Sequence, residues 1–220
     1  MDFRPFHITL QVAVVATVFT FFLGLLAASR VYKMKRGKGI MDALFTLPMI
    51  LPPTVAGFFL LIAFGRNGFI GGFLHSLGIP VVFTWIGAVI ASIFVSFPLM
   101  YRTARGAFEQ IDQNVLFAAE TLGFSKFKIF WTIKMPMAKA GILAGAVLAF
   151  ARALGEFGAT IMIAGNIPGR TQTMAIAVFS AVSAGNREAA YIWVAILSTM
   201  SFAVIMIINR WGAPNRRSVS

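Results

Sequence analysis

The chain has 220 residues, of which 59% are hydrophobic and only 12% are charged. A soluble domain of this length could not bury so much apolar surface, so the composition indicates an integral membrane protein. The net charge of +12 does not indicate a nucleic-acid partner, because the basic residues lie at the ends of apolar runs rather than in one patch.

Five apolar segments are long enough to cross a hydrocarbon core, which requires about 20 helical residues. The first has its basic cluster after the apolar run, the reverse of a cleaved signal peptide. Residues 171–184 are apolar but too short to span, and we expect a short helix at the outer surface there. We therefore expect an all-α membrane protein with one transmembrane domain over residues 1–220. The expected spans are 8–29, 40–64, 82–104, 137–163 and 189–209.

The distribution of Lys and Arg between the loops predicts the orientation of these spans. Five lie in residues 30–38, six in 102–139 and three in the C-terminal tail (Arg210, Arg216 and Arg217), whereas the loops on the opposite side hold four. Cytoplasmic loops carry the excess of Lys and Arg in membrane proteins. We therefore predict that the N-terminus is outside and the C-terminus cytoplasmic.

The loop at residues 106–136 is expected to be folded. Its apolar residues recur at helical spacing up to Gly123, which can end a helix, and Ser125 can begin a second helix that runs through Met135. Pro136 then suits the first turn of the next membrane helix. This pattern is compatible with an amphipathic pair that rests on lipid, or with a helix presented to the groove of a soluble partner.

The same loop resembles the coupling motif of ABC-transporter permeases, whose pattern is Glu-Ala-Ala, three residues, Gly, nine residues, Ile-x-Leu-Pro. Phe117 and Met135 depart from this pattern, and Glu120 keeps a carboxylate on nearly the same helix face. In that family the short helix docks into a cleft of the ATPase subunit and transmits its closure. The positions that match in register are Ala118, Ala119, Gly123, Ile133 and Pro136. The resemblance assigns ATPase coupling to Phe117, Ala118, Ala119, Glu120, Thr121, Leu122, Gly123, Phe124, Ile133 and Pro136.

The resemblance covers nearly the whole chain. The stretches "LPMILPPTVAGFFLL", "SFPLM", "LAFARALGEFGATI" and "NIPGRTQT" resemble the molybdate branch of type I importer permeases, which is close to the sulfate and tungstate permeases. The resemblance implies a homodimeric permease in the inner membrane of a prokaryote. Its implied partners are a second copy of the chain, two cytoplasmic ATPase subunits that bind ATP and Mg, an extracytoplasmic oxyanion-binding protein and membrane lipid, with no nucleic acid. A permease for tungstate, sulfate or thiosulfate, an ion-coupled secondary transporter and a membrane anchor remain alternatives.

Prolines interrupt the second and third expected spans, and the fourth carries an ion pair. A proline removes a backbone hydrogen bond, and the freed carbonyl needs shelter in protein or a water-lined path. Arg152 and Glu156 lie four residues apart, so each can offset the cost of the other's charge. The prolines and the ion pair either fix helix packing or line an oxyanion path. On such a path the negative charge of Glu156 would keep Arg152 from binding the anion too tightly to release it. The candidate path or gate residues are Pro48, Pro52, Pro53, Thr54, Ser96, Pro98, Arg152 and Glu156.

The fourth span also carries a stripe of small residues, which lets another helix approach closely. The neighbour is either a helix of the same chain or the second copy across a homodimer axis. The stripe consists of Gly141, Gly145, Ala149 and Ala153.

The sequence lacks several signatures of catalysis. No G-x-x-x-x-G-K-[ST] occurs, so the chain has no P-loop for ATP hydrolysis. It has no cysteine, and its two histidines, His7 and His75, stand in separate segments. We therefore expect a non-hydrolysing transport subunit with no catalytic residue, cofactor or metal of its own.

Overall fold

Helices form all the regular structure between residues 2 and 212, the part of the chain that the computed structural model describes. Within this part, four continuous helical segments are long and apolar enough to cross a membrane, and one bent pair can make a fifth crossing. The prediction of an all-α membrane protein is confirmed for these residues. The four long segments are α1 (Arg4–Tyr32), α5 (Trp85–Glu109), the run Lys126–Leu154 and α11 (Arg187–Gly212).

The second predicted span is not the single helix expected for residues 40–64. It is divided into α2 (Lys38–Ile50) and α3 (Pro53–Phe64), which are bent by 111° at the break. A residue before proline is driven out of the helical conformation, and two successive prolines remove two N–H donors. Leu51 is accordingly extended, with ψ 139°. With 13 residues, α2 is only about 20 Å long, so α2 and α3 must cross the bilayer together.

The fourth predicted span has different bounds from those expected. Pro136 lies in the first turn of α8 (Met135–Leu154), as predicted, but α8 continues α7 (Lys126–Ile129) and a π-helical turn (Phe130–Lys134) in one run of 29 residues. The wide π turn directly precedes the proline, and Met135 donates its N–H to the carbonyl of Phe130. At the other end the helix stops at Leu154, not at residue 163. A short helix, α9 (Gly158–Ala164), follows after a break.

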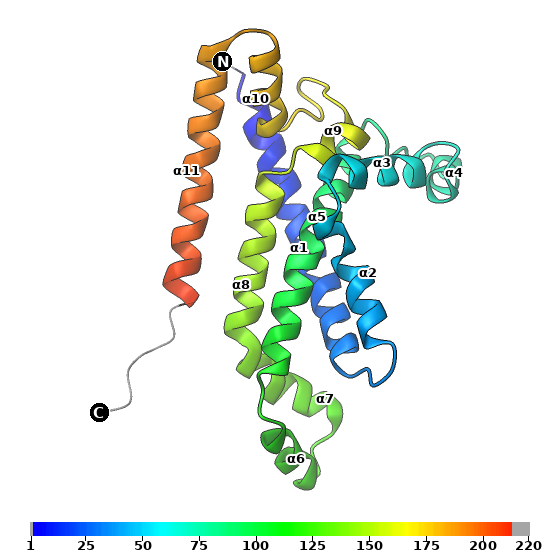
Figure 1. Ribbon diagram of the computed structural model, residues 1–220, viewed down its shortest axis with the longest axis vertical. Helices are drawn as coiled ribbons and strands as arrows, with labels where there is room; N and C mark the ends of the chain where they lie inside the picture. The colour runs from blue at the N-terminus through cyan, green and yellow to red at the C-terminus, as the bar shows by residue number, and fades with distance from the viewer. Residues whose placement is uncertain (1, 213–220) are drawn as a thin grey trace.

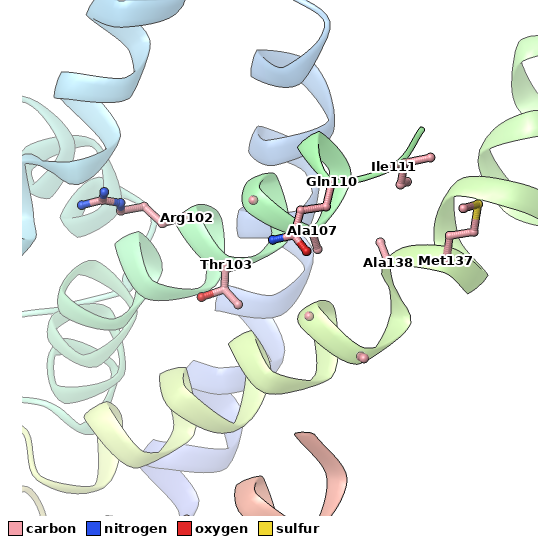
Figure 2. Close-up of a pocket in the computed structure, with 10 residues that line it drawn as sticks. Arg102, Thr103, Ala107, Gln110, Ile111, Met137 and Ala138 are labelled. Atoms are coloured by element: carbon pink, nitrogen blue, oxygen red, sulfur yellow. The ribbon is translucent and has the colours of Figure 1, made fainter. Parts of the chain in front are cut away.

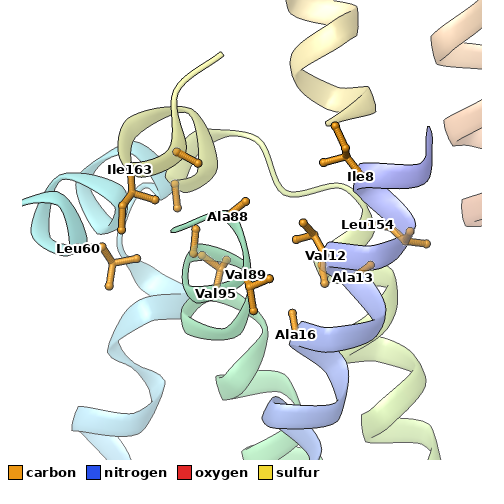
Figure 3. Packing of buried hydrophobic residues seen from close by; sticks show 14 of the residues in the cluster. Ile8, Val12, Ala13, Ala16, Leu60, Ala88, Val89, Val95, Leu154 and Ile163 are labelled. Atoms are coloured by element: carbon orange, nitrogen blue, oxygen red, sulfur yellow. The ribbon is translucent and has the colours of Figure 1, made fainter. Parts of the chain in front are cut away.

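The interior of the bundle lies where α1 packs against both α5 and α8. Small residues permit this close approach: a Cβ atom added at Gly24 would lie 2.6 Å from Cγ of Met100 on α5. Figure 3 shows Val12 and Ala16 on the side of α1 that faces Val89 of α5, while Ala13 lies near Leu154 of α8. In contrast, α1 leaves a broad apolar surface exposed, as expected for a helix that borders lipid. Its exposed members are Val14, Val18, Phe19, Phe22, Leu23 and Leu26.

The small-residue stripe of α8 packs within the chain. A Cβ added at Gly141 would lie 2.6 Å from the Cβ of Ala107, and one added at Gly145 would lie 3.1 Å from Cβ of Thr103, both on α5. Ala149 and Ala153 are also buried. These contacts account for the stripe without a second copy of the chain.

The two ends of the bundle differ in what they carry (Figure 1). The short helices α6 (Gln113–Thr121) and α7 extend beyond one end, which we name the coupling end. The N-terminus lies at the opposite end with α10 (Met174–Ser183), the short helix expected for residues 171–184, while α3 and α4 (Phe69–Ser76) project sideways. Of the basic residues used to predict the orientation, Arg216 and Arg217 lie outside the described residues.

Candidate functional site

The coupling helix α6 is defined by local signals at both ends. The carboxylate of Asp112 accepts the N–H of Asn114 at 2.9 Å and so caps its first turn. At the other end Gly123 has a φ of +79°, a conformation that favours glycine, and Phe124 donates its N–H to the carbonyl of Ala119 at 3.1 Å. The turn after α6 is therefore fixed by the sequence itself.

The two faces of α6 have different environments. Leu116 and Ala119 are buried in the cluster that contains Phe108 and Ile129, which attaches the helix to the bundle. On the outer face Phe117 is 60% exposed and Leu122 75% exposed. Ala118, Glu120 and Thr121 are exposed with them. Because α6 lies beyond the ends of the long helices (Figure 1), this apolar face suits the groove of a protein partner better than the lipid surface.

A second short helix joins this surface to the membrane. Ser125 caps α7 by accepting the N–H of Lys128, as predicted, and the ammonium of Lys128 lies 4.0 Å from the ring centre of Phe124. Ile133 packs partly buried against the same core cluster, and Pro136 is exposed. From Lys126 the helix continues without interruption to Leu154. The motif residues are thus attached to one long, continuous helical segment, Lys126–Leu154.

Arg152 and Glu156 form an ion pair at the end of this helical segment. Nη1 of Arg152 lies 2.7 Å from Oε2 of Glu156, and the side chains are 30% and 1% exposed, respectively. Glu156 does not continue the helix, so the expectation of one helix that carries both charges is wrong. Its other oxygen, Oε1, accepts the N–H of Ala159 at 2.7 Å and thereby satisfies a donor in the first turn of α9. The pair consequently connects the end of α8 to the start of α9.

This α8–α9 joint lies against the break between α2 and α3. A Cβ added at Gly158 would lie 2.8 Å from the Cβ of Pro53 and 3.2 Å from the N of Thr54. A Cβ added at Gly57 would lie 2.7 Å from the Cα of Ala159, so α3 and α9 also touch backbone to backbone. The structure therefore brings together two interrupted spans at one place. Pro52, Pro53 and Thr54 remain exposed beside it.

Other candidate path residues lie elsewhere. Ser96 and Pro98 are buried on α5, where the hydroxyl of Ser96 donates to the carbonyl of Ser92 at 2.6 Å and lies 3.1 Å from the hydroxyl of Thr20 on α1. These groups therefore face the packed interior and α1. The helix continues through Pro98 as one element. Pro48 is buried within the last turn of α2.

A polar network at the coupling end does not follow from the residue pattern. The carboxylate of Asp42 on α2 accepts the hydroxyl of Tyr101 and pairs with Arg105, both on α5. Arg105 also pairs with Glu109 at 3.0 Å, and Glu109 with Lys38 at 2.7 Å. Asp42 is one of only seven acidic residues and lies in an apolar segment, which is the signal that could have identified it. The network ties the start of α2 to α5.

Comparison with known proteins agrees with this arrangement. Residues 20–218 match the family described as binding-protein-dependent transport system inner membrane component. The chain belongs to this family. The permease protein YvgM of Bacillus subtilis (strain 168) is 43% identical over 94% of this chain and 92% of its own length. The molybdenum transport system permease protein ModB of Escherichia coli (strain K12) is 39% identical, over 96% and 93%, respectively.

More distant similarities define the fold and its neighbours. The sulfate transport system permease protein CysT of Salmonella typhimurium is 35% identical over 93% of this chain and 74% of its own length. Among solved structures, a chain of the inward-facing MetNI methionine ABC transporter superposes with a TM-score of 0.69 over 94% of both chains, at 15% identity. The protein thus has the type I importer permease fold and is a component of the inner membrane.

Proposed function

We propose that this chain is the membrane-spanning permease subunit of an ATP-driven importer and that it works as a homodimer. In this proposal a single domain over residues 1–220 conducts molybdate, which an extracytoplasmic binding protein delivers. Two relatives support the substrate: ModB, named for molybdenum transport, is 39% identical over nearly the whole chain, whereas CysT, named for sulfate transport, is 35% identical and matches over only 74% of its own length.

The coupling end would face the cytoplasm, where two ATPase subunits bind ATP and Mg and hydrolyse the nucleotide. The observation that carries the proposal is the outer face of α6, where Phe117 and Leu122 are exposed beyond the end of the bundle. A partner cleft that covers this face would bury apolar surface that otherwise contacts water. The chain itself would then take no chemical part in the hydrolysis.

The proposed transmission of movement runs through parts that are in direct contact. A displacement of α6 reaches α7 through the glycine turn, and α7 continues into α8 as far as Leu154. At that point Arg152 and Glu156 bind the end of α8 to α9, which packs closely on α3. A rigid-body movement at the coupling end would thus change the packing of two interrupted helices in the membrane.

The ion pair itself is the proposed regulator of anion passage. Arg152 is partly exposed and offers a positive charge to the oxyanion, while Glu156 limits the depth of the well so that the anion can leave. The test measures uptake in Arg152→Met and Glu156→Gln after assembly of each complex has been verified. We expect a reduced rate in at least one variant, and normal uptake in both would exclude a role on the path.

One reconstitution experiment tests both which anion is transported and whether an ATPase drives the transport. The chain is purified with its ATPase subunits, reconstituted, and supplied with its binding protein loaded with molybdate, tungstate, sulfate or thiosulfate. We expect molybdate to give the largest stimulation of ATP hydrolysis. A larger response to another anion would reassign the substrate, and uptake by the chain without any ATPase would indicate a secondary transporter instead.

A further inference from the structure

A second basic feature lies at the coupling end of the bundle. Between the facing ends of α5 and α8 is a cavity of about 460 Å³. It is lined by the polar residues Arg102, Thr103 and Gln110, by small residues that include Gly106, Ala140 and Gly141, and by Ile111 and Met137. In Figure 2, Arg102 lies at one end of this cavity, and Met137 and Ala138 lie at the other.

Arg102 is the unpaired charge that itself lines the cavity. It is exposed, and it forms no ion pair with any residue between 2 and 212. Lys139, between the lining residues Ala138 and Ala140, also forms no ion pair within the described residues. Arg102 also borders a neighbouring cavity whose two carboxylates, Asp42 and Glu109, are already paired with Arg105 and Lys38. Arg102 therefore has no carboxylate at ion-pair distance among the described residues, and in Figure 2 its guanidinium extends away from Thr103 and the other labelled lining residues.

The lining of this cavity is more polar than the lipid-type surface of α1. That surface is built of exposed Val, Leu and Phe, whereas the cavity combines a guanidinium, an amide and a hydroxyl with small residues and the apolar side chains of Ile111 and Met137. Charged and amide groups within membrane helices usually face a water-filled path or another protein surface. An oxyanion of tetrahedral shape needs such a space, with a cation and hydrogen-bond donors at its rim.

The cavity is aligned with the ion pair deeper in the membrane. Gly141 and Arg152 are eleven residues apart on α8, which is about three turns, so they share one face of the helix. Gly145 contacts Thr103, the neighbour of Arg102, and Arg152 lies seven residues farther along, or about 10 Å. Leu148, which is 38% exposed, stands on the same face between them. Arg102 and Arg152 thus lie at successive depths along the α5–α8 pair, and Gly141 and Gly145 pack against α5 between them.

We propose that the cavity between α5 and α8 is an exit site for the transported oxyanion and that Arg102 supplies its charge. This inference rests on the proposed transport function. An anion that leaves Arg152 meets Arg102 before it reaches the solvent at the coupling end. A weak second site lowers the barrier of departure from the first without holding the ion permanently.

The test uses the absence of cysteine from the natural sequence. A Cβ added at Gly106 meets nothing within 4 Å, so Gly106→Cys places a thiol without a clash where this cavity meets the neighbouring one. Gly39→Cys is the matched control, because Gly39 is also free of neighbours within 4 Å and lies near the start of α2. The complete complex is placed in nanodiscs of phosphatidylcholine, and each thiol is labelled with an anionic or a cationic methanethiosulfonate.

We expect Arg102→Gln to lower the ratio of anionic to cationic labelling rates by about threefold in the Gly106→Cys variant, and not in the Gly39→Cys variant. Molybdate in millimolar amounts should slow labelling of the Gly106→Cys variant only. An unchanged ratio, equal protection of both thiols, or a disulfide cross-link between two copies of the Gly106→Cys chain would overturn the exit site. Protection that needs anionic phospholipid and is not given by molybdate would assign the cavity to a lipid headgroup instead.

ATP hydrolysis stimulated by the loaded binding protein is measured on the same Gly106→Cys and Gly39→Cys preparations. If no anion stimulates hydrolysis, the proposed transport function fails. If stimulation is normal but Arg102→Gln has no effect on labelling, only the exit site fails.

Discussion

The coupling loop and the α8–α9 joint both use an acidic side chain to begin a short helix, yet they are stabilised in opposite ways. Asp112 caps α6 at an exposed position, and α6 leaves Phe117 and Leu122 in contact with solvent. Glu156 serves α9 from a buried position and carries a full charge into the membrane region. The exposed apolar surface of α6 indicates that a protein partner covers it. The buried charge of Glu156 indicates that this residue holds α8 and α9 together.

The largest loss of stability is expected at the α8–α9 joint. Glu156→Ala removes the acceptor for the Ala159 N–H and leaves Arg152 without its partner. Removing one member of a buried pair costs about 3–5 kcal/mol, so we expect a large loss of thermal stability of the purified complex. The matched double variant Arg152→Met/Glu156→Gln leaves no unpaired charge and should recover much of the loss. Equal melting temperatures for Glu156→Ala and the wild type would show that the joint does not depend on the pair.

A smaller loss is expected where α3 and α9 touch. In Gly57→Val the new Cβ would lie 2.7 Å from Cα of Ala159 and 2.9 Å from its carbonyl oxygen, and backbone atoms cannot rotate away as a side chain can. Overpacking of this kind costs about 1–3 kcal/mol. Gly39→Val is the control, because its Cβ has open space. Thermal unfolding of both variants, followed in the same detergent, should lower the midpoint for Gly57→Val alone.

These two regions also differ in how far the sequence predicts them. The ends of α6 and α7 depend on Gly123 and Ser125, which act on their own neighbours, so a local pattern was sufficient. The end of α8 at Leu154 depends on Gly158 fitting against Pro53, a contact between segments about 100 residues apart in the chain, in addition to the local hydrogen bond from Ala159 to Glu156. Periodicity alone favoured one long helix there. The two adjacent prolines indicated an interruption between α2 and α3 but not its angle, which depends on the packing against α9.

The exposed face of α6 can be altered without destabilising the fold. Leu122→Ser replaces a side chain that is 75% exposed, so the stability of the isolated chain should change little. If a partner cleft buries this leucine, the loss of its apolar contact should weaken binding of the ATPase about tenfold. Titration of the ATPase subunits onto the permease in nanodiscs measures this change. Phe69→Ser, at a side chain that is 97% exposed away from the coupling end, provides the control. The same loss of ATPase affinity in both variants would contradict the proposed docking surface.

The smallest change in stability is expected in the ion network of Asp42 at the coupling end. Its dependence on salt should differ from that of the buried pair. Asp42→Asn removes a carboxylate that is 28% exposed and pairs with Arg105, and its amide oxygen can still accept the hydroxyl of Tyr101. Pairs this accessible contribute about 1 kcal/mol or less, and they weaken as salt rises. We therefore expect a small drop in melting temperature for Asp42→Asn at about 50 mM salt that disappears near about 0.5 M. The loss caused by Glu156→Ala should persist at both salt concentrations, because solvent ions do not reach a side chain that is 1% exposed. If the two variants responded to salt in the same way, the difference in burial would not govern how these charges stabilise the protein.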